Sequence, residues 1–134
     1  DIVVMLQPTS PLRTAPEVEK CVDKLLRESW DAVWTVSETD LTYHPHKQVN
    51  LSDTGVLTFF HGSGSQIVAR QELTPAFHRN GVCYSFTSDF VRRSASVFSE
   101  GRSTAVVLPG CHISIDTHDD ILAVESIIQT RDQT

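Results

Sequence analysis

The chain of 134 residues has a mass of 14.9 kDa, which corresponds to one domain of about 100–150 residues or to part of a larger one. Apolar residues make up 40% and charged residues 21% of the sequence, which excludes a disordered or fibrous protein, and no apolar run approaches the roughly 20 residues that a membrane span needs. The formal net charge of −6 argues against nucleic acid as a partner, because binding a phosphate backbone needs a clustered positive surface.

The first third of the sequence predicts a strand, a helix and a second strand. Residues 2–6 form a continuous apolar run, which is typical of a strand covered on both faces of a parallel sheet. Thr14 precedes an amphipathic helical pattern and is expected to form a capping box with Glu17, and residues 32–36 are again strand-like. A strand, a helix and a strand in so short a stretch indicate a βαβ unit and therefore the α/β class.

Residues 38–80 differ in character and predict an arm inserted into a single domain that spans 1–134. Most of the histidines lie in this segment. Its two strand-like runs, 56–60 and 66–69, flank a stretch of alternating glycine and serine at 62–65. We therefore expect an antiparallel β-hairpin whose tip is the Gly/Ser stretch.

The remaining sequence returns to strands and helices. We expect strands at 81–86, 105–108 and 112–115, a helix over 88–98, and a final helix that Thr117 caps. The predicted fold is thus α/β, with a mostly parallel sheet, flanking helices and an inserted β-hairpin.

The chain has three cysteines, an odd number without the spacing of a metal site: Cys21, Cys83 and Cys111. Each lies among apolar neighbours, so we expect all three to be buried free thiols. Free thiols indicate a reducing compartment, and we therefore expect a cytoplasmic protein.

Two loops occupy the place where open α/β sheets bind ligands, the carboxyl edge of the strands. Gln7 follows the first strand, and its amide either reaches a ligand or braces the loop. Asp116 lies between a strand and a helix cap, where it either binds a metal ion or only caps the helix. His44 and His46 lie two residues apart, but a zinc site needs a third ligand that the sequence does not identify.

Several short motifs occur in the order that one enzyme family shows. They are LQPTSPLR at residues 6–13, HPHK at 44–47, RQELTPAF followed by NGVCY within 70–84, and SIDT with Asp120 within 114–120. The first motif resembles the LQPTSPLR signature of the acylneuraminate cytidylyltransferases, the enzymes that make CMP-activated sialic acids and relatives such as legionaminic acid. The other motifs resemble segments that follow the signature in sequences of the same family. The resemblance therefore covers nearly the whole chain.

The resemblance implies a Rossmann-like nucleotidyltransferase fold and the transfer of CMP from CTP to a sialic-acid-like sugar acid, with release of pyrophosphate. It implies Asp116 and Lys47 as catalytic residues and Mg²⁺ as cofactor. Asp116 would bind the metal together with Ser114, which stands where the family carries an acid. A serine hydroxyl is a poorer magnesium ligand than a carboxylate, so this difference weakens the expected metal site.

The resemblance also implies a set of substrate-binding residues. They are Gln7, Lys47, Arg70, His78, Asn80 and Tyr84. Gln7 would contact the sugar, while Lys47 and Arg70 would attract its carboxylate, which a guanidinium and an ammonium recognise well. His78 stands where the family usually carries a basic residue, so this contact is expected either to depend on pH or to be lost.

The family's first strand, loop and helix, whose Gly- and Lys-containing loop cradles the CTP triphosphate, do not occur in the sequence. We therefore expect a truncated, inactive or partner-dependent form. The inserted segment resembles the family's dimerisation element, so we expect a homodimer or a larger homo-oligomer. The alternative is a non-catalytic module that binds a sugar acid or dimerises.

Overall fold

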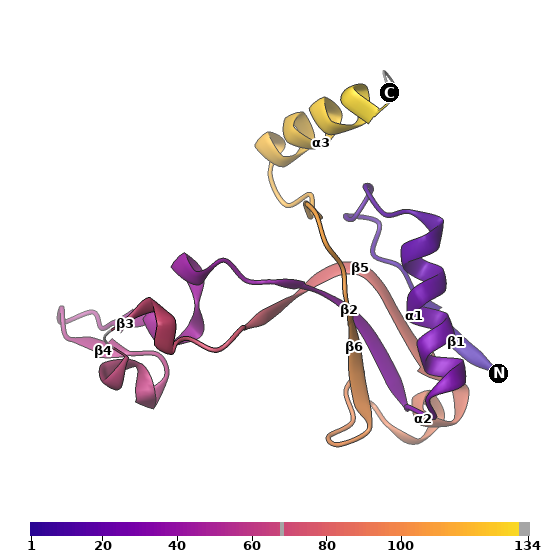
Figure 1. Ribbon diagram of the computed structural model, residues 1–134, viewed down its shortest axis with the longest axis horizontal. Helices are drawn as coiled ribbons and strands as arrows, with labels where there is room; N and C mark the ends of the chain where they lie inside the picture. Colours follow the sequence, from indigo (N-terminus) through magenta and orange to yellow (C-terminus); the bar gives the residue numbers. More distant parts are fainter. Residues whose placement is uncertain (68, 132–134) are drawn as a thin grey trace. The chain divides into compact units, whose positions relative to one another are not determined.

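The computed structural model describes residues 1–67 and 69–131, and the chain forms two compact units. The larger unit combines residues 1–37 with the chain from Arg79 onward, and the smaller unit is Glu38–His78. Figure 1 shows the larger unit as a sheet flanked by helices and the smaller unit as a group of short strands and helical turns. None of the described helices is long and apolar enough to cross a membrane.

A four-stranded sheet in the order β1-β5-β2-β6 is the centre of the larger unit. Its strands are β1 (Ile2–Met5), β5 (Phe77–Thr87), β2 (Ala32–Glu38) and β6 (Ser103–Val107). β2 and β6 pair in parallel, whereas β1 pairs with β5 in antiparallel orientation. The α/β class is confirmed.

The environment predicted for the first strand is wrong. β1 lies at the edge of the sheet, and its residues Val3, Val4 and Met5 are 38–40% exposed. A continuous apolar run carries no alternation that could separate a central strand from an edge strand, so the sequence pattern alone favoured the buried position.

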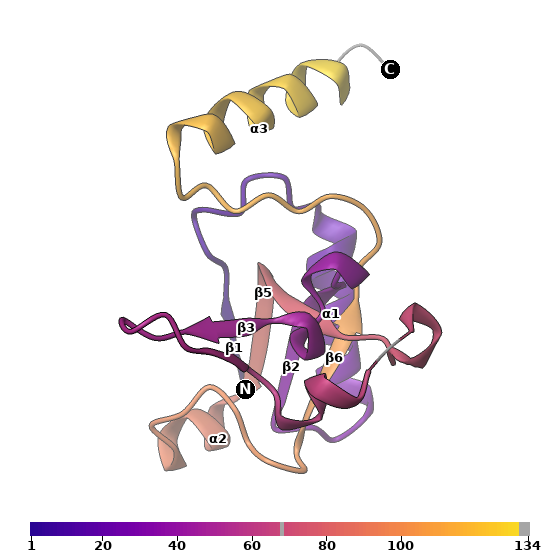
Figure 2. The same cartoon turned by 90° about the vertical axis from the view of Figure 1, so that its left-hand side faces the viewer.

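Helix α1 (Ala15–Arg27) covers one face of this sheet (Figure 2). The capping box is confirmed, since the Thr14 N–H donates to Glu17 Oε2 at 2.8 Å. On the inner side of the helix, Cys21 and Leu25 are buried and pack in one cluster with Val33 and other sheet residues. Burial of this apolar face stabilises the helix far more than its intrinsic propensity does.

The opposite face of the sheet carries a smaller cluster that includes Tyr84, Phe86 and Phe90. Helix α2 (Ser88–Arg93) contributes Phe90 but ends five residues before the predicted end. Beyond it, Ser94 Oγ accepts the Ser96 N–H and Ser96 Oγ accepts the Phe98 N–H, both at 3.1 Å. Serine side chains that bond to nearby backbone groups compete with helical hydrogen bonds, which explains the early end.

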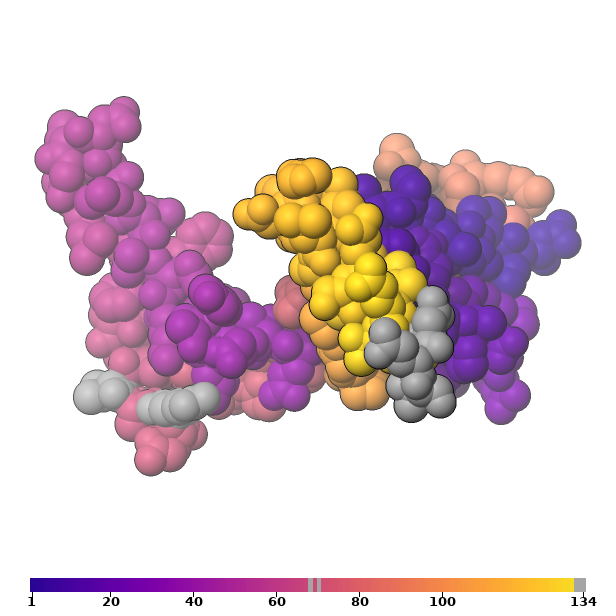
Figure 3. Space-filling view, turned by 90° about the horizontal axis from the view of Figure 1, so that it is seen from above, coloured from indigo at the N-terminus to yellow at the C-terminus, as the bar shows by residue number. Residues whose placement is uncertain are grey.

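The segment after β6 differs from the prediction as well. Residues 112–115 join no strand among the described residues, and the Ile115 N–H donates to the Thr9 carbonyl of a loop at 2.8 Å. The final helix, α3 (His118–Arg131), is confirmed together with its cap, because the Asp120 N–H donates to Thr117 Oγ1 at 3.3 Å. In Figure 3, α3 is the yellow surface that faces the viewer.

The smaller unit holds a hairpin of β3 (Val49–Leu51) and β4 (Leu57–Phe59), joined by a turn in which Gly55 has φ +81°. The strand predicted at 56–60 is confirmed by β4, but its partner strand lies before it in the chain and not at 66–69. The Gly/Ser stretch belongs to a 3-10 helix, Gly62–Gln66, and not to the hairpin tip. Of the second predicted strand, 66–69, residue 68 lies outside the described residues. Ser52 makes the real turn, since its Oγ accepts the Val56 N–H at 2.9 Å.

Candidate functional site

The loop after β1 is held to the sheet by polar contacts. Ser10 is 2% exposed, and its Oγ donates to the Asn80 carbonyl at 3.4 Å. Arg13 donates to the Ser10 carbonyl at 2.9 Å and also to the Gln7 carbonyl. The backbone of Gln7 is thereby fixed, while Gln7 itself is exposed at the end of the strand.

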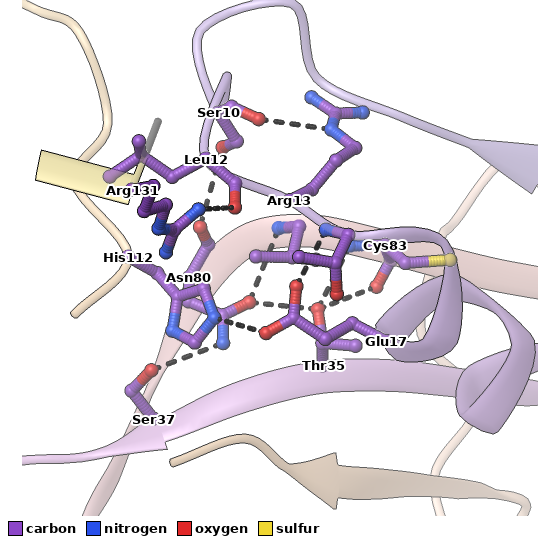
Figure 4. Close-up of polar contacts among 12 residues, drawn as sticks. Ser10, Leu12, Arg13, Glu17, Thr35, Ser37, Asn80, Cys83, His112 and Arg131 are labelled. Carbon is purple, nitrogen blue, oxygen red and sulfur yellow. Dashed lines mark hydrogen bonds and ion pairs between the residues drawn. The ribbon is translucent and has the colours of Figure 1, made fainter. Parts of the chain in front are cut away.

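Asn80, at the beginning of the buried part of β5, forms the polar centre beneath this loop (Figure 4). Its Oδ1 accepts hydrogen bonds from Thr35 Oγ1 at 2.7 Å and from the Val82 N–H at 3.2 Å, and its Nδ2 donates to Ser37 Oγ at 3.1 Å. Asn80 is only 5% exposed. The structure therefore places its amide among protein partners, where it ties β5 to the end of β2.

The segment that carries Asp116 lies against the loop that carries Gln7. Ser114 Oγ donates to Thr9 Oγ1 at 3.3 Å, next to the backbone bond that Ile115 makes to Thr9. The N–H groups of Asp116 and Thr117 both donate to Asp120 Oδ2, at 3.1 and 2.7 Å. The Thr117 hydroxyl donates to the same oxygen at 2.8 Å. This hydroxyl lowers the pKa of Asp120 most, and the two N–H groups lower it further. Asp116 itself is exposed.

A pair that the sequence analysis missed joins this segment to α1. His112 Nε2 lies 2.7 Å from Glu17 Oε1, and the two side chains are 5% and 17% exposed. Burial raises the pKa of Glu17, but the hydrogen bonds from His112 and Thr14 outweigh it and hold the pKa below its ordinary value. Glu17 was identified only as a capping residue, because no local pattern predicts a contact with a residue so distant in the sequence.

Tyr84 lies in the interior of the larger unit. It is 4% exposed, and its ring meets that of Trp34 edge to face with centroids 5.5 Å apart. From this position it supports the sheet face from within.

The predicted residues Lys47, Arg70 and His78 belong to the smaller unit. Lys47 is exposed at the end of the 3-10 helix Pro45–Lys47. The backbone of Arg70 begins a second helical turn, Arg70–Glu72, while its side chain lies outside the described part. His78 is exposed, with its Nδ1 3.0 Å from Thr39 Oγ1.

Three histidines of the smaller unit cluster together. The ring centroid of His46 lies 5.0 Å from that of His44 and 4.4 Å from that of His61. Within residues 1–67 and 69–131, however, no group of three His, Cys, Asp or Glu side chains is arranged to hold a metal ion, so the zinc hypothesis gains no support.

The prediction for the cysteines needs one correction. Cys21 and Cys83 are buried free thiols as expected, but Cys111 is exposed. It follows Gly110, whose φ is +92°, in the irregular connection after β6.

Comparison with known proteins bears on what this arrangement does. No protein-family model matches the chain. Curated N-acylneuraminate cytidylyltransferases of Streptococcus agalactiae, from a serotype V and a serotype III strain, are 27% identical over 121 residues, which are 90% of this chain and 29% of each relative. The chain is a homologue of the N-acylneuraminate cytidylyltransferases. It spans less than a third of their length.

A solved structure supports the fold of this cytidylyltransferase homologue. The crystal structure of 4-diphosphocytidyl-2C-methyl-D-erythritol synthase from Anaerococcus prevotii superposes with a TM-score of 0.59 at 14% identity. The match covers 96% of this chain and 57% of that one. The nucleotidyltransferase-like α/β fold is therefore confirmed.

The two residues that the sequence analysis assigned to a magnesium site, Ser114 and Asp116, lie in the segment before α3. Mg²⁺ in proteins is commonly held by one or two carboxylates together with substrate phosphates and waters. Asp116 offers one exposed carboxylate, and the Ser114 hydroxyl is engaged with Thr9. The carboxylate of Asp120 already accepts hydrogen bonds from the cap of α3.

Proposed function

We propose that the chain is the sugar-acid-binding part of an enzyme that transfers CMP from CTP to a sialic-acid-like nonulosonic acid and releases pyrophosphate. The observation that carries the proposal is the contact between the two loops through Thr9. It brings the backbone of the Gln7 loop against the segment of Asp116, at the end of the strands where such sheets bind ligands. Homology to cytidylyltransferases supports the reaction class.

In the proposed mechanism the protein positions its substrates and supplies charge, since phosphoryl-type transfer needs alignment and charge neutralisation more than covalent help. The family resemblance assigns Gln7 to the sugar, and Lys47 and Arg70 to its carboxylate. A bound Mg²⁺ would neutralise phosphate charge beside Asp116, with Ser114 as a weaker neighbour. His78 adds a further polar contact.

The polar centre supports this site without touching the substrate. Asn80 holds the Gln7 loop from below, and Tyr84 supports the sheet face from within. In this proposal both act by shaping the pocket.

The triphosphate contacts lie outside this sequence, which contains no Gly-rich phosphate loop. We therefore propose that the chain alone does not catalyse the CMP transfer. It needs the phosphate-binding part of the enzyme or a partner protein. We further propose that the smaller unit mediates assembly into a homodimer or a larger homo-oligomer. The free thiols Cys21, Cys83 and Cys111 support a reducing, cytoplasmic location.

The experiment is a calorimetric titration of the chain with N-acetylneuraminate and, as a control, with its methyl ester, combined with a pyrophosphate assay after addition of CTP and Mg²⁺. We expect binding of the free acid, weaker binding of the ester and no pyrophosphate. Lys47→Ala and Arg70→Ala should each weaken binding of the acid about tenfold or more, as expected for the loss of a charge-assisted hydrogen bond. Equal binding of acid and ester, or turnover at about 1 per second or faster, would contradict the proposal.

A further inference from the structure

Gly81 occupies the position directly beneath the Gln7 amide. Its φ is +72°, a conformation that side-chain-bearing residues rarely adopt. A Cβ at this position would lie 2.4 Å from Gln7 Oε1 and 2.6 Å from Ser10 Oγ, far inside van der Waals contact. The amide of Gln7 thus fills space that exists only because residue 81 has no side chain.

The backbone at this step cannot move away to make room. The Asn80 amide is fixed by Thr35, Ser37 and the Val82 N–H, and the Asn80 carbonyl accepts the Ser10 hydroxyl. Any added atom at residue 81 must therefore displace the flexible end of a side chain, and the nearest one belongs to Gln7.

We propose that the step Asn80–Gly81 is the element that positions Gln7: Asn80 fixes the backbone, and Gly81 leaves the space in which the Gln7 amide lies. Both are positioning residues, which act on the substrate through Gln7. The consequence for sugar-acid binding rests on the proposed function, whereas the placement of the Gln7 amide does not.

The chain offers a matched control for the test. Gly101 has φ +70°, almost the value of Gly81, but nothing lies within 4 Å of the Cβ that an alanine would add there. Gly81→Ala and Gly101→Ala therefore carry similar backbone strain, and only the first adds contacts with Gln7 and Ser10. We expect both variants to lower Tm, and Gly81→Ala to lower it more because of these contacts.

The measurement that separates them is the side-chain NH₂ signal of Gln7 in an ¹⁵N–¹H NMR spectrum, assigned with Gln7→Ala. Gly81→Ala should shift this signal and Gly101→Ala should leave it unchanged. Titration with N-acetylneuraminate should show about tenfold weaker binding for Gly81→Ala, and the double variant Gly81→Ala/Gln7→Ala should bind no more weakly than Gln7→Ala alone, because the two changes act through one group.

An unshifted Gln7 signal in Gly81→Ala, or additive losses in the double variant, would overturn the inference. If no form of the chain binds N-acetylneuraminate while the Gln7 signal still shifts, the proposed function fails and the positioning role stands. If Gly81→Ala does not fold, Gly81→Asn with Gly101→Asn as its control repeats the comparison, since asparagine tolerates positive φ better than alanine.

Discussion

The Glu17 carboxylate and the His112 ring, 95 residues apart in the chain, form a 2.7 Å contact that fastens the start of α1 to the segment leading to Asp116. The same carboxylate also accepts the Thr14 N–H through its other oxygen, at 2.8 Å. One side chain therefore caps a helix and anchors a loop that we assign to the site.

Glu17→Ala should lower the free energy of unfolding by about 2–4 kcal/mol at neutral pH, because it removes a helix cap and a charge-assisted hydrogen bond. Urea denaturation measures the loss, and Glu19→Ala on the exposed side of the same helix should change stability by less than about 0.5 kcal/mol.

The effect of Glu17 should depend on pH in a defined direction. Its pKa in the folded chain lies below the ordinary value of 4.5, so its stabilisation is present above that value and is lost as pH falls through the folded pKa. The difference between wild type and Glu17→Ala should therefore narrow when the denaturation is repeated at about pH 3. A difference of constant size would contradict this account.

Asn80→Ala should destabilise the larger unit by about 2–4 kcal/mol, because it leaves the Thr35 hydroxyl, the Ser37 hydroxyl and the Val82 N–H without their buried partner. Thermal or urea unfolding measures the change. Asn50→Ala, at an exposed position of β3, is the control and should be nearly neutral. Equal effects of the two variants would show that the network contributes little.

Acidification should loosen the smaller unit through His46. Burial of its ring and the neighbouring His61 and His44 lower the pKa of His46, so the unfolded chain binds the proton more tightly than the folded one. The smaller unit therefore has its full stability above pH 6.5, the ordinary pKa of histidine. Its stability falls as the pH drops from there to the lowered pKa of His46. Hydrogen-exchange protection factors of β3 and β4 should fall over this range.

His46→Gln should remove most of that pH response, whereas His118→Gln, at the exposed start of α3, should keep it. Protection factors that stay constant in the wild-type chain down to about pH 5.5 would rule out the histidine cluster as their cause.

Gly64→Ala should destabilise the smaller unit by about 1–3 kcal/mol through overpacking. An added Cβ would lie 2.6 Å from the His46 carbonyl oxygen and 2.6 Å from Phe59 Cδ1. Gly62→Ala, two residues earlier in the same 3-10 helix, meets nothing within 4 Å and should be neutral or slightly stabilising. Local hydrogen exchange of β4 compares the two variants, and equal protection would argue against the close contact.

A thiol-reactive dye should label Cys111 rapidly and the other two cysteines only on unfolding, because Cys21 and Cys83 are fully buried. Cys111→Ser should abolish the rapid phase and leave the slow one. Rapid labelling of two or three thiols in the native chain would show that α1 does not pack stably on the sheet.

The elements that the sequence predicted correctly depend on interactions between near neighbours. Thr14 with Glu17, and Thr117 with Asp120, are capping pairs three residues apart, and the structure has both. One hairpin strand, β4, was predicted, but its partner was missed, because Val49–Leu51 lies in a polar context and its pairing with β4 decides its conformation. The residues 112–115 have strand-like composition but no partner strand among the described residues.

The site was predictable only in part, for a related reason. The motifs identified Gln7 and Asp116, and the structure brings their loops together through Thr9. The buried partners that hold these loops, such as His112 and Thr35, come from distant parts of the chain. No spacing in the sequence reveals contacts that only the folded sheet creates.

The chain enters and leaves the smaller unit at neighbouring points. At its base, the Thr39 N–H donates to the Ala76 carbonyl at 2.8 Å, where the continuations of β2 and β5 run together. The intervening residues thus form a closed excursion that could be excised and replaced by a tight two-residue turn, leaving a shortened protein for separating the roles of sheet and arm.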